Sequence, residues 1–291
     1  MSTDQSRPPR LLTIAGSDSG GGAGIQADLK AFARAGAHGM SAITAITAQN
    51  TVDVREVFPL PPQAIVAQVA AVADDIGVDA VKIGMLGTVE TIEAVDRALD
   101  LIGDVPVVLD PVMVAESGAV LLDGGARDAL RERIVPRATV VTPNLPEARV
   151  LAGRGTAGNG SGEETAALAG AIHALGPEAV VVTGGHRDVA ADMFFDGERL
   201  EEIAGERYPD GAAHGSGCTH SSTLAAQLAR GLDPLAAARV AKAVASEAVR
   251  DGLRSIGAGA GPVDVFGLAR QPARDAPALG ATAAGRGGEV S

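Results

Sequence analysis

The sequence from Leu11 to Asp28 reads LLTIAGSDSGGGAGIQAD. It begins with an apolar run, Leu11–Ala15, typical of a buried strand, and passes through a glycine-rich stretch into helical apolar spacing over Ile25–Ala35. A strand, a tight loop and a helix in this order form the start of a βαβ unit. Such units predict a mainly parallel sheet covered by helices.

The same alternation continues along the chain. Further strand-like runs are Val78–Ile83, Val105–Leu109, Thr139–Thr142 and Ala179–Thr183. Segments with helical apolar spacing are Pro62–Ile76, Val89–Ile102, Ala126–Ile134, Glu163–Leu175, Cys218–Ala229 and Pro234–Arg254. The pattern predicts an α/β fold with helices on both faces of the sheet. Ser41–Thr47 and Val52–Phe58 are expected to be strands outside this alternation, at an edge.

Composition limits the function classes. The 291 residues are 46% hydrophobic and 21% charged, as in ordinary globular proteins. We expect a flexible N-terminus over 1–10, one domain over 11–268 and a disordered tail over 269–291. The net charge of -12 argues against binding nucleic acid or an anionic membrane, and no apolar run is long enough to span one. A single cysteine and no apolar signal segment favour the cytoplasm.

The glycine-rich loop Gly16–Gly24 follows a strand and precedes a helix, which is where open α/β sheets bind ligands. Gly22–Ala27 also fits a dinucleotide fingerprint, so an NAD-dependent oxidoreductase is an alternative, although no acidic residue ends a second strand at the required distance. A tight turn without a ligand is the third interpretation. A P-loop is excluded, because its Gly-Lys-Ser/Thr ending does not occur.

The segment from His214 to His220, HGSGCTH, opens a predicted helix. Small residues at a helix N-terminus expose backbone N–H groups beside the positive end of the helix dipole, so the segment predicts an anion cradle suited to a phosphoryl group. The same field is expected to favour the thiolate of Cys218, making it a candidate proton acceptor. The alternative is an inert buried thiol. The two histidines could be only caps or surface groups, which is the favoured interpretation for His220.

Oxygen-bearing side chains follow two predicted strands. Asp110 comes after one, and Asn144 and Glu147 come after the next. Carboxylate and amide oxygens are suited to Mg²⁺ near nucleotide phosphates. Asn144 and Glu147 could instead form only a helix capping box.

Three further residues have chemistry suited to a flat heterocycle such as an aminopyrimidine. Asp28 and Gln49 can hydrogen-bond a polar ring edge, and Met85 can pack on a ring face. Taken singly, each has a plain structural explanation: a solvated helix charge, a turn amide and a core methionine.

Seven motifs follow one another in order between Leu11 and about Phe266: Ala15–Asp28, Ala48–Asn50, Lys82–Leu86, Leu109–Met113, Thr142–Glu147, Gly184–His186 and His214–Thr219. This ordered set resembles the hydroxymethylpyrimidine/phosphomethylpyrimidine kinase family. The resemblance implies a ribokinase-like fold and a homodimer acting in thiamine biosynthesis. It implies two successive transfers from Mg-ATP, to 4-amino-5-hydroxymethyl-2-methylpyrimidine and then to its monophosphate.

The resemblance also implies site residues. The pyrimidine pocket would be formed by Gly16, Asp28, Gln49, Met85 and Val112. The anion hole would be Gly215, Ser216, Gly217 and Cys218, with Cys218 where related sugar kinases have an aspartate base. The metal side would be Asp110 and Glu147, and the nucleotide side Asn144, Thr183 and Gly185.

One residue departs from the family pattern. Several relatives have Lys immediately before the Gly-Gly-His segment, where this chain has Thr183. A hydroxyl supplies no charge to offset a phosphate. Either the charge comes from elsewhere, or one of the two transfers is slower.

Alternatives and loop assignments stay open at this level. A pyridoxal kinase of the same superfamily is the nearest rival, and a noncatalytic sensor of pyrimidine phosphates is a remote one. Val114–Gly125 is expected to act as a lid, because its glycines could absorb hinge motion. Gly153–Gly162 is expected to be a surface loop that could flank the nucleotide.

Overall fold

The computed structural model describes residues 7–155, 158, 160–184, 190–209 and 211–270. Its centre is a nine-stranded sheet with the order β3-β2-β1-β4-β5-β6-β7-β8-β9. The strands are β1 (Arg10–Asp18), β2 (His38–Gln49), β3 (Val54–Pro59), β4 (Ala80–Ile83), β5 (Val107–Leu109), β6 (Val140–Val141), β7 (Ala179–Val182), β8 (Asp192–Phe195) and β9 (Leu200–Ile203). The strands β2, β1, β4, β5, β6 and β7 run parallel to one another. At the two edges, β3 is antiparallel to β2, β8 is antiparallel to β7, and β9 is antiparallel to β8.

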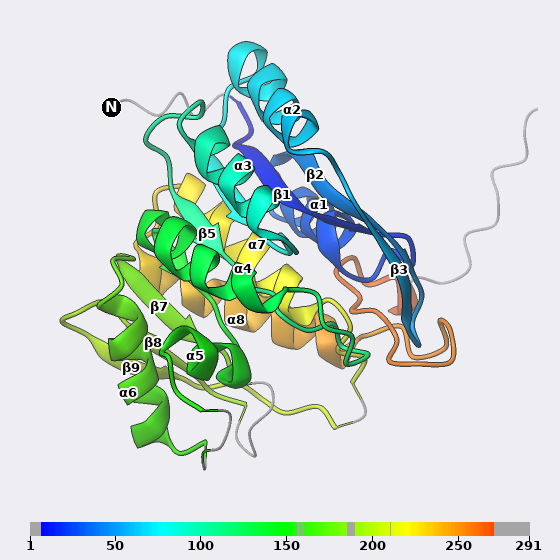
Figure 1. Cartoon of the computed structure of the whole chain (residues 1–291). Helices are drawn as coiled ribbons and strands as arrows, with labels where there is room; N and C mark the ends of the chain where they lie inside the picture. The colour runs from blue at the N-terminus through cyan, green and yellow to red at the C-terminus, as the bar shows by residue number, and fades with distance from the viewer. Residues whose placement is uncertain (1–6, 156–157, 159, 185–189, 210, 271–291) are drawn as a thin grey trace, which may run out of the picture.

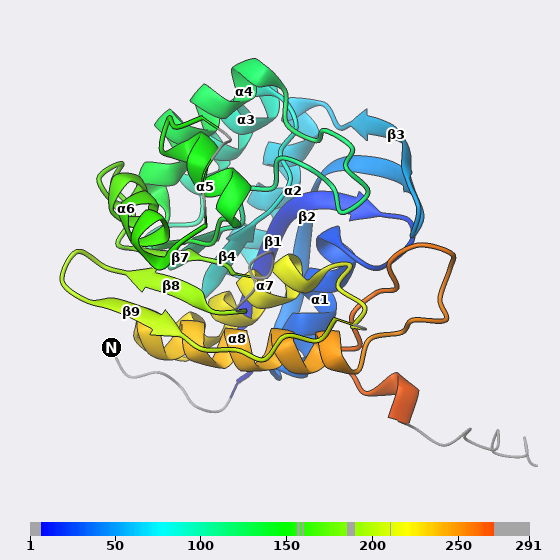
Figure 2. The same cartoon turned by 90° about the horizontal axis from the view of Figure 1, so that it is seen from below.

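Helices cover both faces of the sheet (Figures 1 and 2). They are α1 (Gly24–Arg34), α2 (Pro62–Asp75), α3 (Val89–Leu99), α4 (Gly124–Ala129), α5 (Leu145–Leu151), α6 (Gly162–His173), α7 (Ser216–Ala229) and α8 (Pro234–Arg250). A π-helical turn, Leu130–Ile134, continues α4, and short 3₁₀ turns lie at Val135–Arg137 and Leu268–Arg270. Residues of α2 to α6 contribute to one hydrophobic core, and residues of α1, α7 and α8 to the other.

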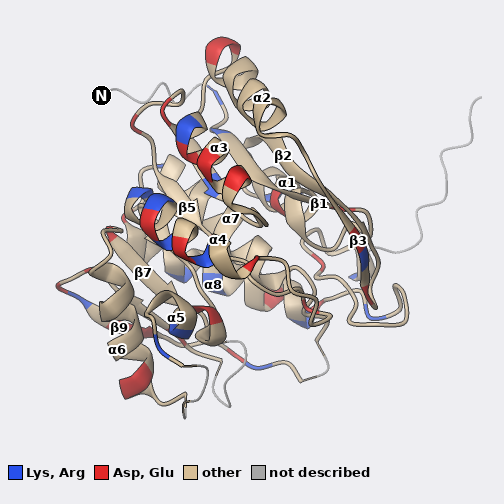
Figure 3. Ribbon diagram, in the orientation of Figure 1, with Lys and Arg blue, Asp and Glu red and all other residues tan. Residues whose placement is uncertain are grey.

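Successive strand residues serve opposite cores, because side chains alternate across a sheet. Leu12 and Val107 belong to the α2–α6 core, whereas their neighbours Leu11 and Val108 belong to the α1, α7 and α8 core. Strands buried on both faces therefore read as continuous apolar runs. In Figure 3, β5 and β7 carry no charged residue, whereas α3 and α4 carry charges.

Side-chain caps begin several helices. The hydroxyl of Thr88 accepts from the amide of Thr91 at the start of α3. Asp233 accepts from the amides of Leu235 and Ala236 at the start of α8. Such caps satisfy amides that have no partner inside the helix, so they fix where each helix begins.

The predicted alternation of strands and helices is confirmed, with some differences at the sheet edges. Of the two strands expected at an edge, only β3 is there; β2 pairs with β1 inside the sheet. The strands β8 and β9 were not predicted, because neither is a continuous apolar run: β8 begins with Asp192, and β9 carries two exposed or half-buried glutamates. In the described part of the chain, no helix combines the length and apolarity needed to cross a membrane.

The ends of the chain were predicted to be flexible or disordered. Residues 1–6 and 271–291 lie outside the described residues. The last part of the N-terminal stretch is in contact with the domain, since Arg7 and Arg10 both form ion pairs with Asp79.

Leu109 ends β5 directly before Asp110 and is completely buried. We expect Leu109→Ala to lower the free energy of unfolding by about 2–5 kcal/mol, because it removes buried methyl groups and leaves a cavity. Leu101→Ala, at a side chain that is 46% exposed, is the matched control and should change it by less than about 0.5 kcal/mol. Urea denaturation followed by circular dichroism measures both, and equal effects would contradict the assigned core position.

Candidate active site

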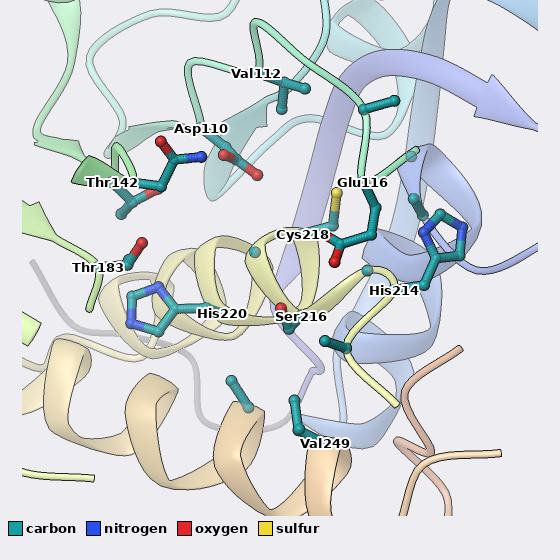
Figure 4. Close-up of a pocket in the computed structure, with 18 of the residues that line it drawn as sticks. Asp110, Val112, Glu116, Thr142, Thr183, His214, Ser216, Cys218, His220 and Val249 are labelled. Atoms are coloured by element: carbon teal, nitrogen blue, oxygen red, sulfur yellow. The ribbon is translucent and has the colours of Figure 1, made fainter. Parts of the chain in front are cut away.

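A cavity of about 450 Å³ lies at the carboxyl ends of the central parallel strands. Its walls include residues at the ends of β1 and β4, the segments after β5 and β6, and the start of α7. This is the edge at which open α/β sheets bind ligands. In Figure 4, Cys218 lies near the middle, His214 lies at one end, and His220 and Thr183 lie together at the other.

The anion loop, Gly215–Cys218, was predicted and lines this cavity. Gly215 precedes α7 with φ +85°, and a Cβ there would lie 1.8 Å from the carbonyl oxygen of Gly22. Only glycine allows both this backbone conformation and this approach. The loop is thereby held against the glycine-rich loop, with the first turn of α7 at the cavity. The amide of Ser216 in this turn donates to the carbonyl of Ala213 at 3.0 Å.

The glycine-rich loop is organised around the carboxylate of Asp18. This carboxylate accepts hydrogen bonds from the amides of Gly20, Gly22 and Ala23, at 2.7, 3.0 and 2.8 Å. His214 is buried and places Nε2 3.1 Å from the same group. Burial works against ionisation of Asp18, but these hydrogen bonds and the charge of His214 lower its pKa below the ordinary value.

This arrangement contradicts the dinucleotide interpretation. Amides that would bind a pyrophosphate at the start of α1 are already bonded to Asp18. The interpretation of the loop as a turn without a ligand is also wrong in part, because Gly16 and Gly24 line the cavity. His214 is neither a cap nor a surface group.

The thiol of Cys218 faces the cavity and is half-buried. Loss of solvation raises its pKa to about 12; Lys82 lowers it in part, while Asp28 and Asp110 raise it further. The prediction that the helix field favours a thiolate is therefore wrong for the protein without ligands. Desolvation and two nearby carboxyl groups outweigh that field.

Asp28 does not line the cavity, so its predicted position in the pyrimidine pocket is corrected. The side chain is completely buried beneath it and is not a solvated helix charge either. Its carboxylate accepts from Lys82 Nζ at 2.8 Å, Thr13 Oγ1 at 2.6 Å and Ser222 Oγ at 2.7 Å. Every oxygen of Asp28 is thus committed to the protein.

Lys82 was missed as a site residue. It is completely buried in β4, lines the cavity floor and places Nζ 3.7 Å from Asp110 Oδ2. Burial works to lower the pKa of Lys82, but the negative charges beside it, first of all Asp28, raise it. Lys82 therefore stays a cation. A lysine inside the four-residue apolar strand AVKI was the available signal, because buried lysines require a partner.

Asp110 and Glu147 lie close enough for their charges to interact, as predicted for the metal side. Ser221 donates to Asp110 at 3.1 Å, and the amide of Met113 donates to Glu147 at 3.3 Å. Burial and then the neighbouring Asp110 raise the pKa of Glu147 to about 8, and burial also raises the pKa of Asp110. A cation would relieve this repulsion.

The predicted capping box is confirmed. The side chain of Asn144 accepts from the amide of Glu147, and Glu147 accepts from the amide of Asn144, both at 2.9 Å. Both residues also line the cavity, so the cap does not exclude a second role. Across the described residues there is no cluster of three or more acidic, His or Cys side chains that could hold a metal ion. Two carboxylates fit Mg²⁺ whose other ligands are phosphates and water.

The four other residues predicted for the pyrimidine, Gly16, Gln49, Met85 and Val112, all line the cavity. A Cβ on Gly16 would lie 2.8 Å from Met85 Cε, so glycine leaves room for that methionine. Gln49 Oε1 accepts from Thr47 at 3.1 Å, which orients the amide. The segment after Val112 folds back on itself through a bridge between Val114 and Val120 and lines the cavity, where a lid was expected.

The opposite end of the cavity contains Thr183. The backbone amide of Thr183 donates a hydrogen bond to the carbonyl oxygen of Pro143 at 2.8 Å, which holds Thr183 beside Asn144. Gly185, predicted for the nucleotide, lies outside the described residues, as does part of Gly153–Gly162. His220 and Lys242 also line this end. The interpretation of His220 as a surface group is wrong, because it is 4% exposed.

Comparisons with known proteins show the family of this chain. A family model described as phosphomethylpyrimidine kinase matches residues 18–264. A hydroxymethylpyrimidine/phosphomethylpyrimidine kinase of Rhizobium meliloti is 48% identical over 88% of this chain and 96% of its own length. The thiamine biosynthesis bifunctional protein ThiED of Geobacter sulfurreducens is 45% identical over 91% of this chain and 54% of its own. The structure of Bacillus subtilis pyridoxal kinase with ADP is 39% identical, with a TM-score of 0.82 over 91% of this chain and all of that one.

The raised pKa of Glu147 predicts a pH effect on stability. Between its ordinary pKa of 4.5 and about 8, the unfolded chain is ionised while the folded chain keeps the proton. The free energy of unfolding therefore falls as pH rises through this window. Glu147→Gln, which can still occupy this capping position, should reduce that fall.

Urea denaturation at pH 5 and pH 8 measures the effect, with the ligand-free protein. Glu163→Gln is the control, because Glu163 is exposed in the first turn of α6. Equal pH dependence in wild type and Glu147→Gln would show that the carboxyl group of Glu147 titrates normally.

Proposed function

The chain belongs to the phosphomethylpyrimidine kinase family, and from this premise we propose that it phosphorylates 4-amino-5-hydroxymethyl-2-methylpyrimidine at the expense of ATP. It then phosphorylates the monophosphate to the diphosphate, in thiamine diphosphate biosynthesis. The observation that carries the proposal is one cavity that joins an anion loop, a ring-sized apolar end and a carboxylate-bearing end. A phosphoryl transfer needs these three parts in line.

The pyrimidine binds at the end formed by Gly16, Gln49, Met85 and Val112. The amide of Gln49 hydrogen-bonds the polar ring edge, and Met85 packs on the ring face. Asp28 lies beneath the cavity and accepts a hydrogen bond from Lys82, whose side chain lines the cavity floor. The hydroxymethyl oxygen then lies toward Cys218 and the anion loop.

The amides of Gly215, Gly217 and Cys218 stabilise charge on the transferred phosphoryl group, while the amide of Ser216 donates to the carbonyl of Ala213. The substrate oxygen forms the new bond to phosphorus while the bond to the ADP oxygen breaks, and the hydroxyl proton passes to Cys218, whose thiol has first released its own proton to solvent. Burial raises the pKa of the Cys218 thiol, and the charge of Asp110 raises it further. A group that offsets the charge of Asp110 would lower this pKa and so ease formation of the thiolate. Proton acceptance therefore belongs to the complex with substrates.

Asp110 and Glu147 would hold Mg²⁺, which when bound offsets charge on the nucleotide phosphates. Asn144, Thr183 and Gly185 form the nucleotide side. ATP as the donor is supported by the ADP complex of the similar pyridoxal kinase. We also propose a single kinase domain over 11–268 that acts as a homodimer in the cytoplasm.

A pyridoxal kinase remains the second candidate, because a solved structure 39% identical to this chain is a pyridoxal kinase. A noncatalytic sensor of pyrimidine phosphates would bind these ligands without turnover.

We expect purified protein with Mg-ATP and the hydroxymethylpyrimidine to form the monophosphate first and the diphosphate afterwards. Mass-resolved chromatography follows both products, and pyridoxal in a parallel reaction is the comparison. Preferential phosphorylation of pyridoxal would replace the proposal by its rival. Tight binding of the pyrimidine phosphate without ATP consumption would indicate the sensor.

Replacing the proton acceptor should affect the chemical step. Cys218→Ala is expected to lower kcat by about 10²–10⁴-fold with little change in KM for the pyrimidine, because general-base catalysis contributes on that order. Cys218→Ser, of similar size, tests whether the effect needs the sulfur. Thermal denaturation checks folding, and an unchanged kcat in Cys218→Ala would rule out Cys218 as the base.

A further inference from the structure

His220 is a buried imidazole with unused hydrogen-bonding capacity. It lies in the first turns of α7, two residues after Cys218, and is 4% exposed. In the described part of the chain, neither Nδ1 nor Nε2 has a hydrogen-bond partner. Leaving such a group unpaired in the interior is unfavourable, so its presence in a cavity wall points to a ligand.

Asp192 lies beside this histidine without forming a hydrogen bond to it. Its Oδ2 lies 3.5 Å from His220 Nε2, at the outer limit of a hydrogen bond. Its Oδ1 accepts from Lys242 Nζ at 2.7 Å and from the amide of Gly184 at 2.9 Å. Burial works against ionisation of Asp192, but His220 and Lys242 lower its pKa, so the carboxylate stays charged beside them.

The position of this cluster in the cavity identifies the ligand chemistry. His220 lies beside Thr183, at the end away from His214 (Figure 4). Thr183 is bridged to Asn144, which places the cluster next to the carboxylate pair of Asp110 and Glu147. This is the end of the cavity assigned to the nucleotide, whose phosphates require hydrogen-bond donors.

Other basic side chains in the wall are already engaged. Lys82 is bonded to Asp28 and lies near Asp110. Arg207 also has an interaction partner. The nitrogens of His220 are therefore the donors available beside Thr183, with Lys242 next to them.

We propose that His220 donates a hydrogen bond to a phosphate oxygen of the nucleotide, at the end of the cavity that contains Thr183. Asp192 lies beside the ring, and Lys242 of α8 is bonded to the other oxygen of that carboxylate. The inference rests on the proposed kinase function.

The test measures nucleotide affinity in four proteins: wild type, His220→Leu, Thr183→Lys and the double variant. ADP with Mg²⁺ is titrated by calorimetry, and KM for ATP is measured separately from kcat. We expect His220→Leu to weaken ADP binding and raise KM for ATP at least about tenfold, the range for a hydrogen bond to a charged group. His220→Gln, which keeps a donor, should lose less.

The double variant discriminates most sharply. Because Thr183 lies beside His220, a lysine at position 183 should supply a donor at the same end of the cavity, so Thr183→Lys should restore affinity in the His220→Leu protein and improve it far less in wild type, a non-additive result. His38→Leu, at an exposed position at the start of β2, is the control and should not change affinity.

Unchanged ADP affinity in His220→Leu, or equal gains from Thr183→Lys in both backgrounds, would overturn the inference. Failure of the proposed function looks different, because wild-type protein would then bind ADP without phosphorylating the pyrimidine.

Discussion

The site is built around a buried ion pair between Lys82 and Asp28. Both side chains are completely buried, and Thr13 and Ser222 supply two further hydrogen bonds to the carboxylate. These residues come from β4, α1, β1 and α7, so one carboxylate fixes how four elements meet. Removing either partner of a buried pair would leave an unpaired charge, which typically costs about 3–5 kcal/mol. The geometry of the cavity floor is tied to this pair.

The same charges affect the pKa values of the ionisable groups that line the cavity. Cys218, Asp110 and Glu147 all have raised pKa values, because burial disfavours their charged forms and negative groups lie close to one another. Lys82 offsets this in part. A site of this kind has a high affinity for positive charge. The ionisation of these groups therefore depends on the charges placed beside them.

Sequence patterns predicted the fold and most of the cavity wall for clear physical reasons. Alternating apolar periods define βαβ units, and parallel strands deliver the residues after their carboxyl ends to one edge. The patterns failed where a three-dimensional environment decides. A helical spacing does not reveal that Asp28 faces Lys82, and a helix N-terminus does not reveal that desolvation dominates the pKa of Cys218. Short edge strands such as β9 carry too few apolar residues to be recognised.

Thr183 and His220 illustrate why a motif alone can mislead about a site. Position 183 follows β7 and position 220 lies in α7, so no local pattern connects them. The fold brings them to the same end of one cavity, with Asp192 of β8 and Lys242 of α8 behind them. A positive group needed at a point in space can be supplied from any element whose side chain reaches that point. The polar groups at this end of the cavity are therefore found from the side chains that the fold brings together, and not from any one motif.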